Sequence, residues 1–228
     1  MGSSIGPKIP YDRALVLNLD ASNTRSYLGS GTVWSDLSGR ETNGTLSGTG
    51  NSLTISGSGS TIDSLYFNGS ANASLVTGNF NYGTNARTIM VWARATNFNQ
   101  YGHPFSYGTN ATNQATGIAQ GNSGGAWGTY SSSVEFLNGG SAVSLNTWYH
   151  VVTTYDGSNA TVFVNGSIIV GPSARSYNVT QSLAYVGRYV GPSEDWIGNI
   201  AQVMFYNRAL TGDEVLQIYN TQKKRYGL

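Results

Sequence analysis

Short apolar runs separated by polar segments recur along most of the chain. Runs of this length, bounded by Gly and Asn, predict β-strands. The predicted strands cover residues 14–20, 64–69, 73–78, 87–95, 148–155, 160–164, 183–189 and 196–210. Those between residues 64 and 95 follow one another closely, as in an antiparallel meander. Residues 22–59 contain few apolar side chains, so we expect long loops there and at most one short strand.

The run at residues 87–95 differs from the others because both of its alternating sets are apolar. Met90 and Trp92 belong to one set, and Ile89 and Val91 belong to the other. Such a strand is expected at the centre of a sheet, where both faces are covered. Four shorter Gly-bounded segments between residues 96 and 140 fit further strands joined by exposed loops: HPFSYG, TGIAQ, AWGTYS and VEFLNG.

Two hairpins and one helix give the clearest local signals. Residues 148–155 and 160–164 are joined by the turn sequence DGSN, and Asn165-Gly166 then predicts a type I′ turn before the next strand. Thr211, followed three residues later by Glu214, predicts a capping box at the start of a helix. The basic end of the chain, QKKRYGL, is interpreted as a solvated terminus rather than a docking tail.

The composition favours one all-β domain. Of 228 residues, 39% are hydrophobic, only 10% are charged and 30 are Gly, which is typical of short strands and tight turns. We divide the chain into an N-terminal arm (1–13), an antiparallel β-sandwich domain (14–220) and a basic C-terminal tail (221–228). A net charge of +1 provides no field that could hold a polyanion, so no nucleic acid partner is expected.

The sequence contains neither cysteine nor a long apolar stretch. Without Cys, no disulfide framework and no thiolate metal site can form, so the fold depends on its core. No run of about 18 apolar residues occurs, and the first residues lack the apolar segment of a secretory signal. We therefore expect no membrane partner and no export through a signal peptide.

Four segments, in a fixed order, resemble laminin-G-like domains of the concanavalin A-like lectin/glucanase superfamily. They are LYFNGSANASLVTG, TIMVWARA, LNTWYHVVTTYDGSNATVFVNGSII and GNIAQVMFYNRALTGDEVLQIY. The resemblance covers about residues 14–219 and implies a jelly roll of two antiparallel sheets with variable loops around one rim. The N-terminal part of the domain resembles the opening of such domains in structural proteins of tailed bacteriophages; its sequence is LVLNLDASNTRSYLGSGTVWSDLSGRETNGTLSG. This fold by itself identifies no ligand.

The sequence does not show the residue patterns that catalysis requires. The glucanases of the superfamily need paired carboxylates on one strand face, and their Glu-x-Asp-x-x-Glu signature is absent. Glu194 and Asp195 are adjacent, so they would point to opposite faces of a strand. No Gly-x-Ser-x-Gly elbow occurs, His150 is expected as a satisfied core residue, and His103 is expected in a loop or at the rim. We therefore expect no enzymatic activity.

Calcium is the only metal considered, and no other cofactor is expected. Asp36 and Asn43, in the segment DLSGRETNG, have the hard oxygen atoms that calcium prefers. The alternative is that Asp36 caps a tight turn and that Asn43-Gly44 forms another. The turn interpretation is preferred, because Ala201 and Gln202 stand where the family segment often has acidic residues.

Aromatic side chains beside amides could form a glycan-binding surface, since rings stack on sugar faces and amides bond to hydroxyl groups. The segments 101–130 and 189–196 have this mixture, with Asn110, Asn113 and Gln114 as the amides. The candidate ligand-binding residues are Tyr101, His103, Tyr107, Trp127, Tyr130 and Trp196. The competing interpretation is that many of these rings fill the interior of the sandwich.

Two functions remain open. The preferred hypothesis is a virion structural or decoration protein of a tailed phage, made in the host cytoplasm and displayed on the particle surface. Its expected partners are other virion proteins of the capsid or tail, bound through the N-terminal arm, and cell-surface polysaccharide; a homo-oligomer is also considered. The alternative is a free carbohydrate-binding lectin.

Overall fold

The computed structural model describes residues 13–48, 53–56, 64–70, 72–75, 78–98, 101–121, 124–132 and 135–228. The predicted arm therefore lies outside the described residues, except for Arg13. The elements are, in chain order, β1 (Leu15–Asp20), β2 (Val33–Trp34), β3 (Gly44–Ser47), β4 (Leu53–Ser56), β5 (Ser64–Asn68), β6 (Asn72–Leu75), β7 (Arg87–Ala95), β8 (Gly102–Gly108), β9 (Ala115–Gln120), β10 (Trp127–Ser131), β11 (Glu135–Asn138), β12 (Tyr149–Tyr155), β13 (Asn159–Val164), β14 (Ser167–Ala174), β15 (Leu183–Val186), β16 (Ile197–Tyr206), α1 (Gly212–Gln222) and a final 3-10 helix (Lys223–Tyr226).

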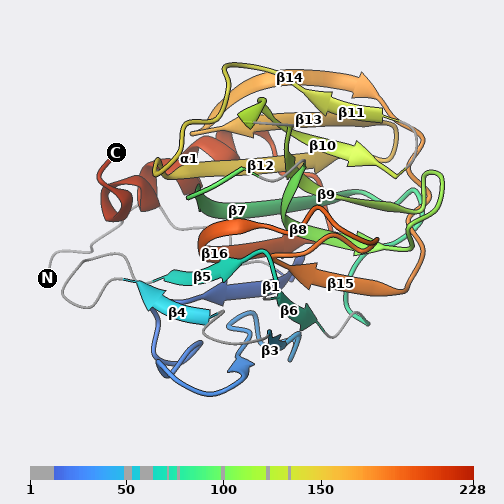
Figure 1. Ribbon diagram of the computed structural model, residues 1–228. Helices are drawn as coiled ribbons and strands as arrows, with labels where there is room; N and C mark the ends of the chain where they lie inside the picture. The colour runs from blue at the N-terminus through green and yellow to red at the C-terminus, as the bar shows by residue number, and fades with distance from the viewer. Residues whose placement is uncertain are drawn as a thin grey trace, which may run out of the picture.

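The strands form two antiparallel sheets, as the sequence predicts (Figure 1). Sheet A has the order β14-β13-β12-β7-β16-β5-β4, with β1 also paired to β16. Sheet B has the order β11-β10-β9-β8-β15-β6-β3-β2. The expected central strand is confirmed: β7 lies between β12 and β16, and all its residues except Arg94 are buried.

The expected meander over residues 64–95 is wrong. β5 and β7 belong to sheet A, whereas β6 between them belongs to sheet B. A local apolar pattern identifies a strand but does not tell whether the next strand pairs beside it or crosses to the opposite sheet. The prediction of at most one short strand in residues 22–59 is also wrong, because β2, β3 and β4 all form there. β2 and β4 are edge strands, which are covered less and need fewer apolar residues.

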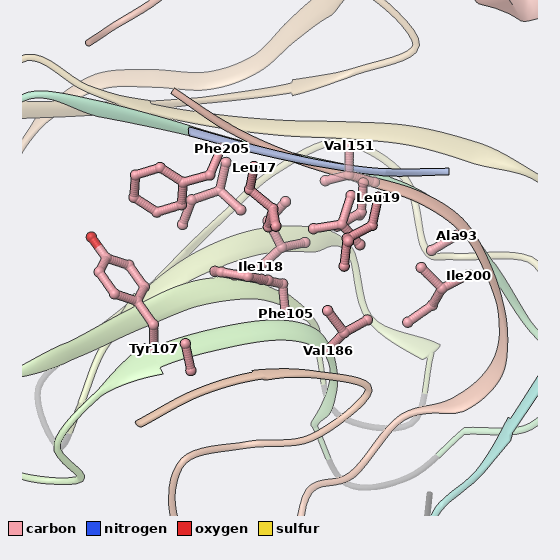
Figure 2. Close-up of a cluster of buried hydrophobic side chains, with 14 of the residues drawn as sticks. Leu17, Leu19, Ala93, Phe105, Tyr107, Ile118, Val151, Val186, Ile200 and Phe205 are labelled. Carbon is pink, nitrogen blue, oxygen red and sulfur yellow. The ribbon is translucent and has the colours of Figure 1, made fainter. Parts of the chain in front are cut away.

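The main core lies between the two sheets (Figure 2). Leu17, Val151 and Phe205 come from sheet A, and Phe105 and Ile118 come from sheet B. All five side chains are excluded from solvent. Because both sheets contribute to this one layer, each depends on the other for burial of its apolar face.

A second apolar layer lies on the outer face of sheet A, where α1 covers it. Val215 and Ile218 of the helix cluster with Met90, Val152 and Met204 of the strands. The capping box is confirmed: the Thr211 hydroxyl accepts from the Glu214 amide at 3.3 Å, and the Glu214 carboxylate accepts from the Thr211 amide at 2.9 Å. In the part of the chain that is described, no helix is long and apolar enough to cross a membrane.

The turn between β13 and β14 fits closely under this helix. Asn165 and Gly166 both have positive φ, at 50° and 80°, which confirms the predicted type I′ turn. A Cβ atom on Gly166 would lie 2.9 Å from the side chains of Leu216 and Tyr219. Glycine is therefore required here both by the turn and by the approach of the helix.

The basic end of the chain is docked, so its interpretation as a solvated terminus is wrong. The Tyr226 ring stacks on Trp92 with 3.7 Å between centroids, and it is buried. Arg225 donates two hydrogen bonds to the Asp20 carboxylate, at 2.7 and 2.8 Å. Aromatic burial outweighs the cost of ordering a terminus, which charge counting alone does not reveal.

We expect Arg225→Met to lower the free energy of unfolding by about 1–2 kcal/mol, because it removes a partly buried bidentate ion pair. Lys224→Met is the matched control, since Lys224 is exposed and adjacent in the chain. Urea unfolding of the two variants measures the difference. Equal stability of both variants would contradict docking of the terminus through Asp20.

Candidate functional site

The outer face of sheet B carries a group of polar and aromatic side chains, whereas α1 covers the outer face of sheet A. We call this group the outer-face cluster. Its members are Tyr101, His103, Asn110, Tyr130, Ser132, Phe136, Tyr189 and Glu194. Short side chains of β9, Ala115 and Ala119, lie among the rings.

Strand alternation places most of this cluster. On β9 and β10, Ile118 and Trp127 point into the core, whereas Ala119 and Tyr130 point outward. β8 departs from simple alternation through a register shift between Gly102 and Phe105. Because of this bulge, His103 packs on the outward rings while Phe105 remains in the core.

His103 is enclosed by two tyrosine rings. Its ring lies 4.7 Å from Tyr189, nearly parallel, and 4.8 Å from Tyr130, edge to face. Nδ1 lies 2.8 Å from the Tyr101 carbonyl and 3.1 Å from the Glu194 carbonyl. Carbonyl oxygens only accept, so Nδ1 carries the proton. Burial lowers the pKa of His103 to about 4, so the imidazole is neutral at pH 7.

Tyr189 is the half-exposed ring of the cluster, and its hydroxyl is fixed. The hydroxyl donates to Asn110 Oδ1 at 2.7 Å, and Ser132 Oγ donates to the same oxygen at 2.9 Å. Both bonds use the amide oxygen of Asn110, which leaves the NH₂ group of this exposed side chain able to donate to a ligand. The ring is therefore held in one orientation beside a polar group.

The cluster is bordered by two carboxylates on an unusual backbone. Ser193 and Glu194 both have left-handed φ values, 66° and 67°, a conformation that costs about 1–3 kcal/mol for each residue other than glycine. Burial raises the pKa of Glu194 and of Asp195. Glu194 Oε2 lies 3.9 Å from His103 Nδ1, and Asp195 lies 4.0 Å from Arg188.

Three of the six predicted ligand-binding residues gather on this face, although His103, which lies in β8 rather than in a loop, and Tyr130 are themselves buried against Tyr189. Tyr101 contacts Phe136 with 5.8 Å between centroids, and His103 and Tyr130 contact each other. The other three, Tyr107, Trp127 and Trp196, are corrections: they are fully buried in the core and present no ring to a ligand. They point inward because the face of a strand, not its aromatic content, determines exposure.

Sequence reasoning did not single out Ser132, Phe136 or Tyr189 individually, although 189–196 was a candidate segment, and it considered Glu194 only as one of a pair of adjacent carboxylates. The register of β10 and β11 pairs Tyr130 directly with Phe136. Cross-strand pairing in this hairpin is the signal that could have found Phe136. Glu194 reaches the cluster through the left-handed turn, which no local pattern predicts.

Asp36 and Asn43 are held by hydrogen bonds to neighbouring groups of the protein. Asp36 accepts hydrogen bonds from the Asn18 and Ser38 amides at 2.8 Å and from the Ser38 hydroxyl at 2.6 Å. Asn43 Oδ1 accepts from the Asp36 amide at 2.8 Å. The side-chain oxygens predicted as calcium ligands are thus engaged by the protein. The turn interpretation holds for Asp36, whereas the predicted Asn43-Gly44 turn is wrong, because Gly44 already begins β3. Within the described ranges, no group of three or more His, Asp or Glu residues is arranged so that it could hold a metal ion.

The remaining candidates for catalysis are placed separately. Glu214 caps α1, and Glu41 is exposed in the loop before β3, while the side chain of Glu135 lies outside the description. His150 is buried as expected, but neither ring nitrogen has a hydrogen-bond partner among the described residues, so the expectation that it is satisfied is wrong.

Solved structures share this fold at low sequence identity. A Trypanosoma rangeli sialidase in complex with the inhibitor DANA has a TM-score of 0.69 and 19% identity over 95% of this chain, but the match covers only 34% of the sialidase. Domain 4 of AbnA, a GH43 extracellular arabinanase from Geobacillus stearothermophilus in complex with arabinotriose, has a TM-score of 0.69 and 18% identity, covering 90% of this chain and 98% of that domain. The binding domain of Paraclostridial Mosquitocidal Protein 1 has a TM-score of 0.61 and 19% identity, covering 91% of this chain and 52% of that one.

These likenesses show the fold alone. No curated protein matches the chain by sequence. A family model does match, that of the third laminin G family, described as the concanavalin A-like lectin/glucanases superfamily, over residues 67–216. Together with the two-sheet sandwich, this match over more than half of the sequence identifies the chain as a member of the concanavalin A-like lectin/glucanase superfamily.

Proposed function

We propose that the protein binds glycans on the outer face of sheet B and does not hydrolyse them. The observation that carries this proposal is the fixed, half-exposed Tyr189 ring, with the exposed Asn110 amide and the Glu194 carboxylate beside it. A sugar ring stacks on such an aromatic face, and its hydroxyl groups bond to amide and carboxylate groups. AbnA domain 4, which shares the fold along nearly its whole length, was solved with arabinotriose.

Preorganisation supports a binding surface. The Tyr189 hydroxyl, Asn110 and Ser132 hold one another before any ligand arrives, and His103 supports the ring from below. A side chain already fixed in its bound orientation loses little conformational entropy on binding. The strained backbone at Ser193 and Glu194 is also typical of functional sites.

Tyr189→Ala is expected to weaken glycan binding at least about tenfold, because it removes the stacking surface. Affinity electrophoresis and calorimetry with immobilised or soluble polysaccharides measure the loss. Tyr66→Ala on β5 of sheet A is the matched control, since Tyr66 is likewise a partly buried tyrosine but lies in the other sheet. If the Tyr189→Ala variant unfolds at the normal temperature and still binds glycans as tightly as the wild type, the outer face of sheet B is not the binding site.

The carboxylates near the cluster support binding rather than hydrolysis. A glycosidase holds two carboxyl groups on either side of the scissile bond. Here Asp195 lies beside Arg188, and Glu194 lies beside His103 Nδ1, which already donates to carbonyl oxygens. Incubation with β-glucans and alginate-like polymers tests this part, and release of new reducing ends would overturn it.

A second candidate function is that of a virion structural or decoration protein of a tailed phage, with the glycan-binding face displayed on the particle. The observation that favours it is the resemblance of residues 15–48 to the opening of such domains in phage structural proteins. Mass spectrometry of purified virions from the same genome tests this role. Presence in the particle would support it, and absence from well-purified particles would leave a free lectin as the function.

A further inference from the structure

The charges around the outer-face cluster are unevenly distributed. Between Arg94 and Arg188 the sequence contains a single cation, Arg175. Strands β8 to β11 and the segments that join them, residues 102–138, therefore contribute no Lys or Arg to this face. The Arg175 guanidinium bonds to Ser173 and Ala174 of β14, in the other sheet.

Arg188 is the cation that does lie near the cluster, and its charge is balanced. Its Nε lies 4.0 Å from Asp195, and its guanidinium lies over the Tyr185 ring at 5.1 Å. His103 contributes no positive charge, because it is neutral and its Nδ1 proton is donated to carbonyl oxygens. Glu194 is then left as the uncompensated charge, so the described residues of the outer-face cluster, taken together with Arg188 and Asp195, have a net charge of −1.

We infer that the outer face of sheet B selects uncharged glycans, with Glu194 accepting hydroxyl protons of the sugar that stacks on Tyr189, and that it rejects glycans bearing carboxylate or sulfate groups. This inference rests on the proposed function and adds the class of ligand. A carboxylate accepts hydrogen bonds but cannot donate them, so it suits the hydroxyl groups of a neutral sugar. A uronate or sialate on the same surface meets like charge at short range, and Arg188, the described guanidinium near the cluster, already lies beside Asp195.

Two pairs of glycans test the inference. Methyl-esterified and de-esterified polygalacturonate differ in the charge of the carboxyl group, and lactose and sialyllactose differ by one added acidic sugar. Calorimetry at low salt is expected to give at least about tenfold tighter binding of the uncharged member. Because the rejection is electrostatic, the ratio should shrink in 0.5 M NaCl. A ratio that does not change with salt would mean that shape, not charge, discriminates.

Glu194→Gln is expected to weaken binding of the uncharged member several-fold and to improve binding of the acidic member, so that the ratio falls toward one. Glu41→Gln is the matched control, because Glu41 is exposed in the loop before β3, at the far end of sheet B from β10 and β11. An unchanged ratio in Glu194→Gln overturns the role of this residue. Preferential binding of acidic glycans would overturn the inferred selection of uncharged glycans but not the proposed glycan binding. If the folded protein binds neither member of any pair, both the inference and the proposed function are wrong.

Discussion

Replacing Arg87 by alanine is expected to lower the free energy of unfolding by about 3–5 kcal/mol, among the largest effects of any single change outside the apolar core. Arg87 begins β7 and is buried between the sheets. Its Nη1 donates to the carbonyls of Gly83 and Asn85, at 3.2 and 2.9 Å. The alanine variant loses both bonds and leaves a cavity.

Three aromatic rings take the place of a counterion for Arg87. The guanidinium lies 4.7 Å from the ring of Tyr155, 5.2 Å from Tyr177 and 5.8 Å from Tyr107. A desolvated cation–π contact contributes about 2 kcal/mol or more. The same residue lines a small internal cavity with Thr116 and Thr129, so alanine would enlarge a void that already exists.

Two further variants separate charge from volume at this position. Arg87→Met fills most of the space and removes the buried charge, so it is expected to lose only about 1–2 kcal/mol. Arg175→Ala is the control, because Arg175 is partly exposed, and it should change the free energy of unfolding by less than about 1 kcal/mol. Urea midpoints with unchanged slopes give these differences. If Arg87→Ala lowers the free energy of unfolding no more than Arg175→Ala does, the three tyrosine rings around Arg87 contribute little to stability.

Acid is expected to destabilise the protein between pH 6.5 and 4.5, before most carboxylates titrate. Burial lowers the pKa of His150 to about 3 and of His103 to about 4. Below pH 6.5 the unfolded chain takes up protons that the folded chain does not, so stability present above this pH is lost as the pH falls. Each histidine accounts for about 2 kcal/mol over this interval.

His150 has no means of accommodating a proton in the fold. It packs beside both Trp92 and Tyr219, at 4.9 and 5.8 Å between ring centroids, and its nitrogens have no acceptor among the described residues. In the C-terminal segment, the Lys223 ammonium lies over the Tyr219 ring at 5.3 Å, and the charge of Arg225 is paired with Asp20. Protonation is therefore opposed by burial and is not offset by a carboxylate.

His150→Phe keeps the stacked ring and removes the titrating group. At pH 7 the variant is expected to be as stable as the wild type or more stable by about 1 kcal/mol, because two unpartnered nitrogens are no longer buried. Between pH 6.5 and 4.5 it should lose about half as much stability, the rest belonging to His103. Urea unfolding at each pH gives the difference in stability between the two proteins. The contribution of carboxylate titration cancels in this difference, because both proteins contain the same carboxylates. Equal pH dependence in both would show that His150 is accessible to protons in the folded state.

The candidate site was predictable only in part, because aromatic residues of the same chemistry lie both on the outer face and in the core. Tyr101, His103 and Tyr130 were found from composition, yet Trp127 and Trp196 have the same chemistry and lie in the core. Whether a ring faces the ligand or the interior depends on strand phase and on the bulge in β8. Neither can be read from a segment rich in Gly and Asn.

The sequence by itself determined the class of fold, the central strand β7, the Asn165-Gly166 turn and the capped helix, because each follows from local alternation, turn chemistry or capping. Only the tertiary structure decided that β5, β6 and β7 alternate between sheets, that Tyr226 docks on Trp92, and that Glu194 meets His103 and Tyr189. These are contacts between distant segments, whose free energy depends on which surfaces the fold brings together and not on any local pattern.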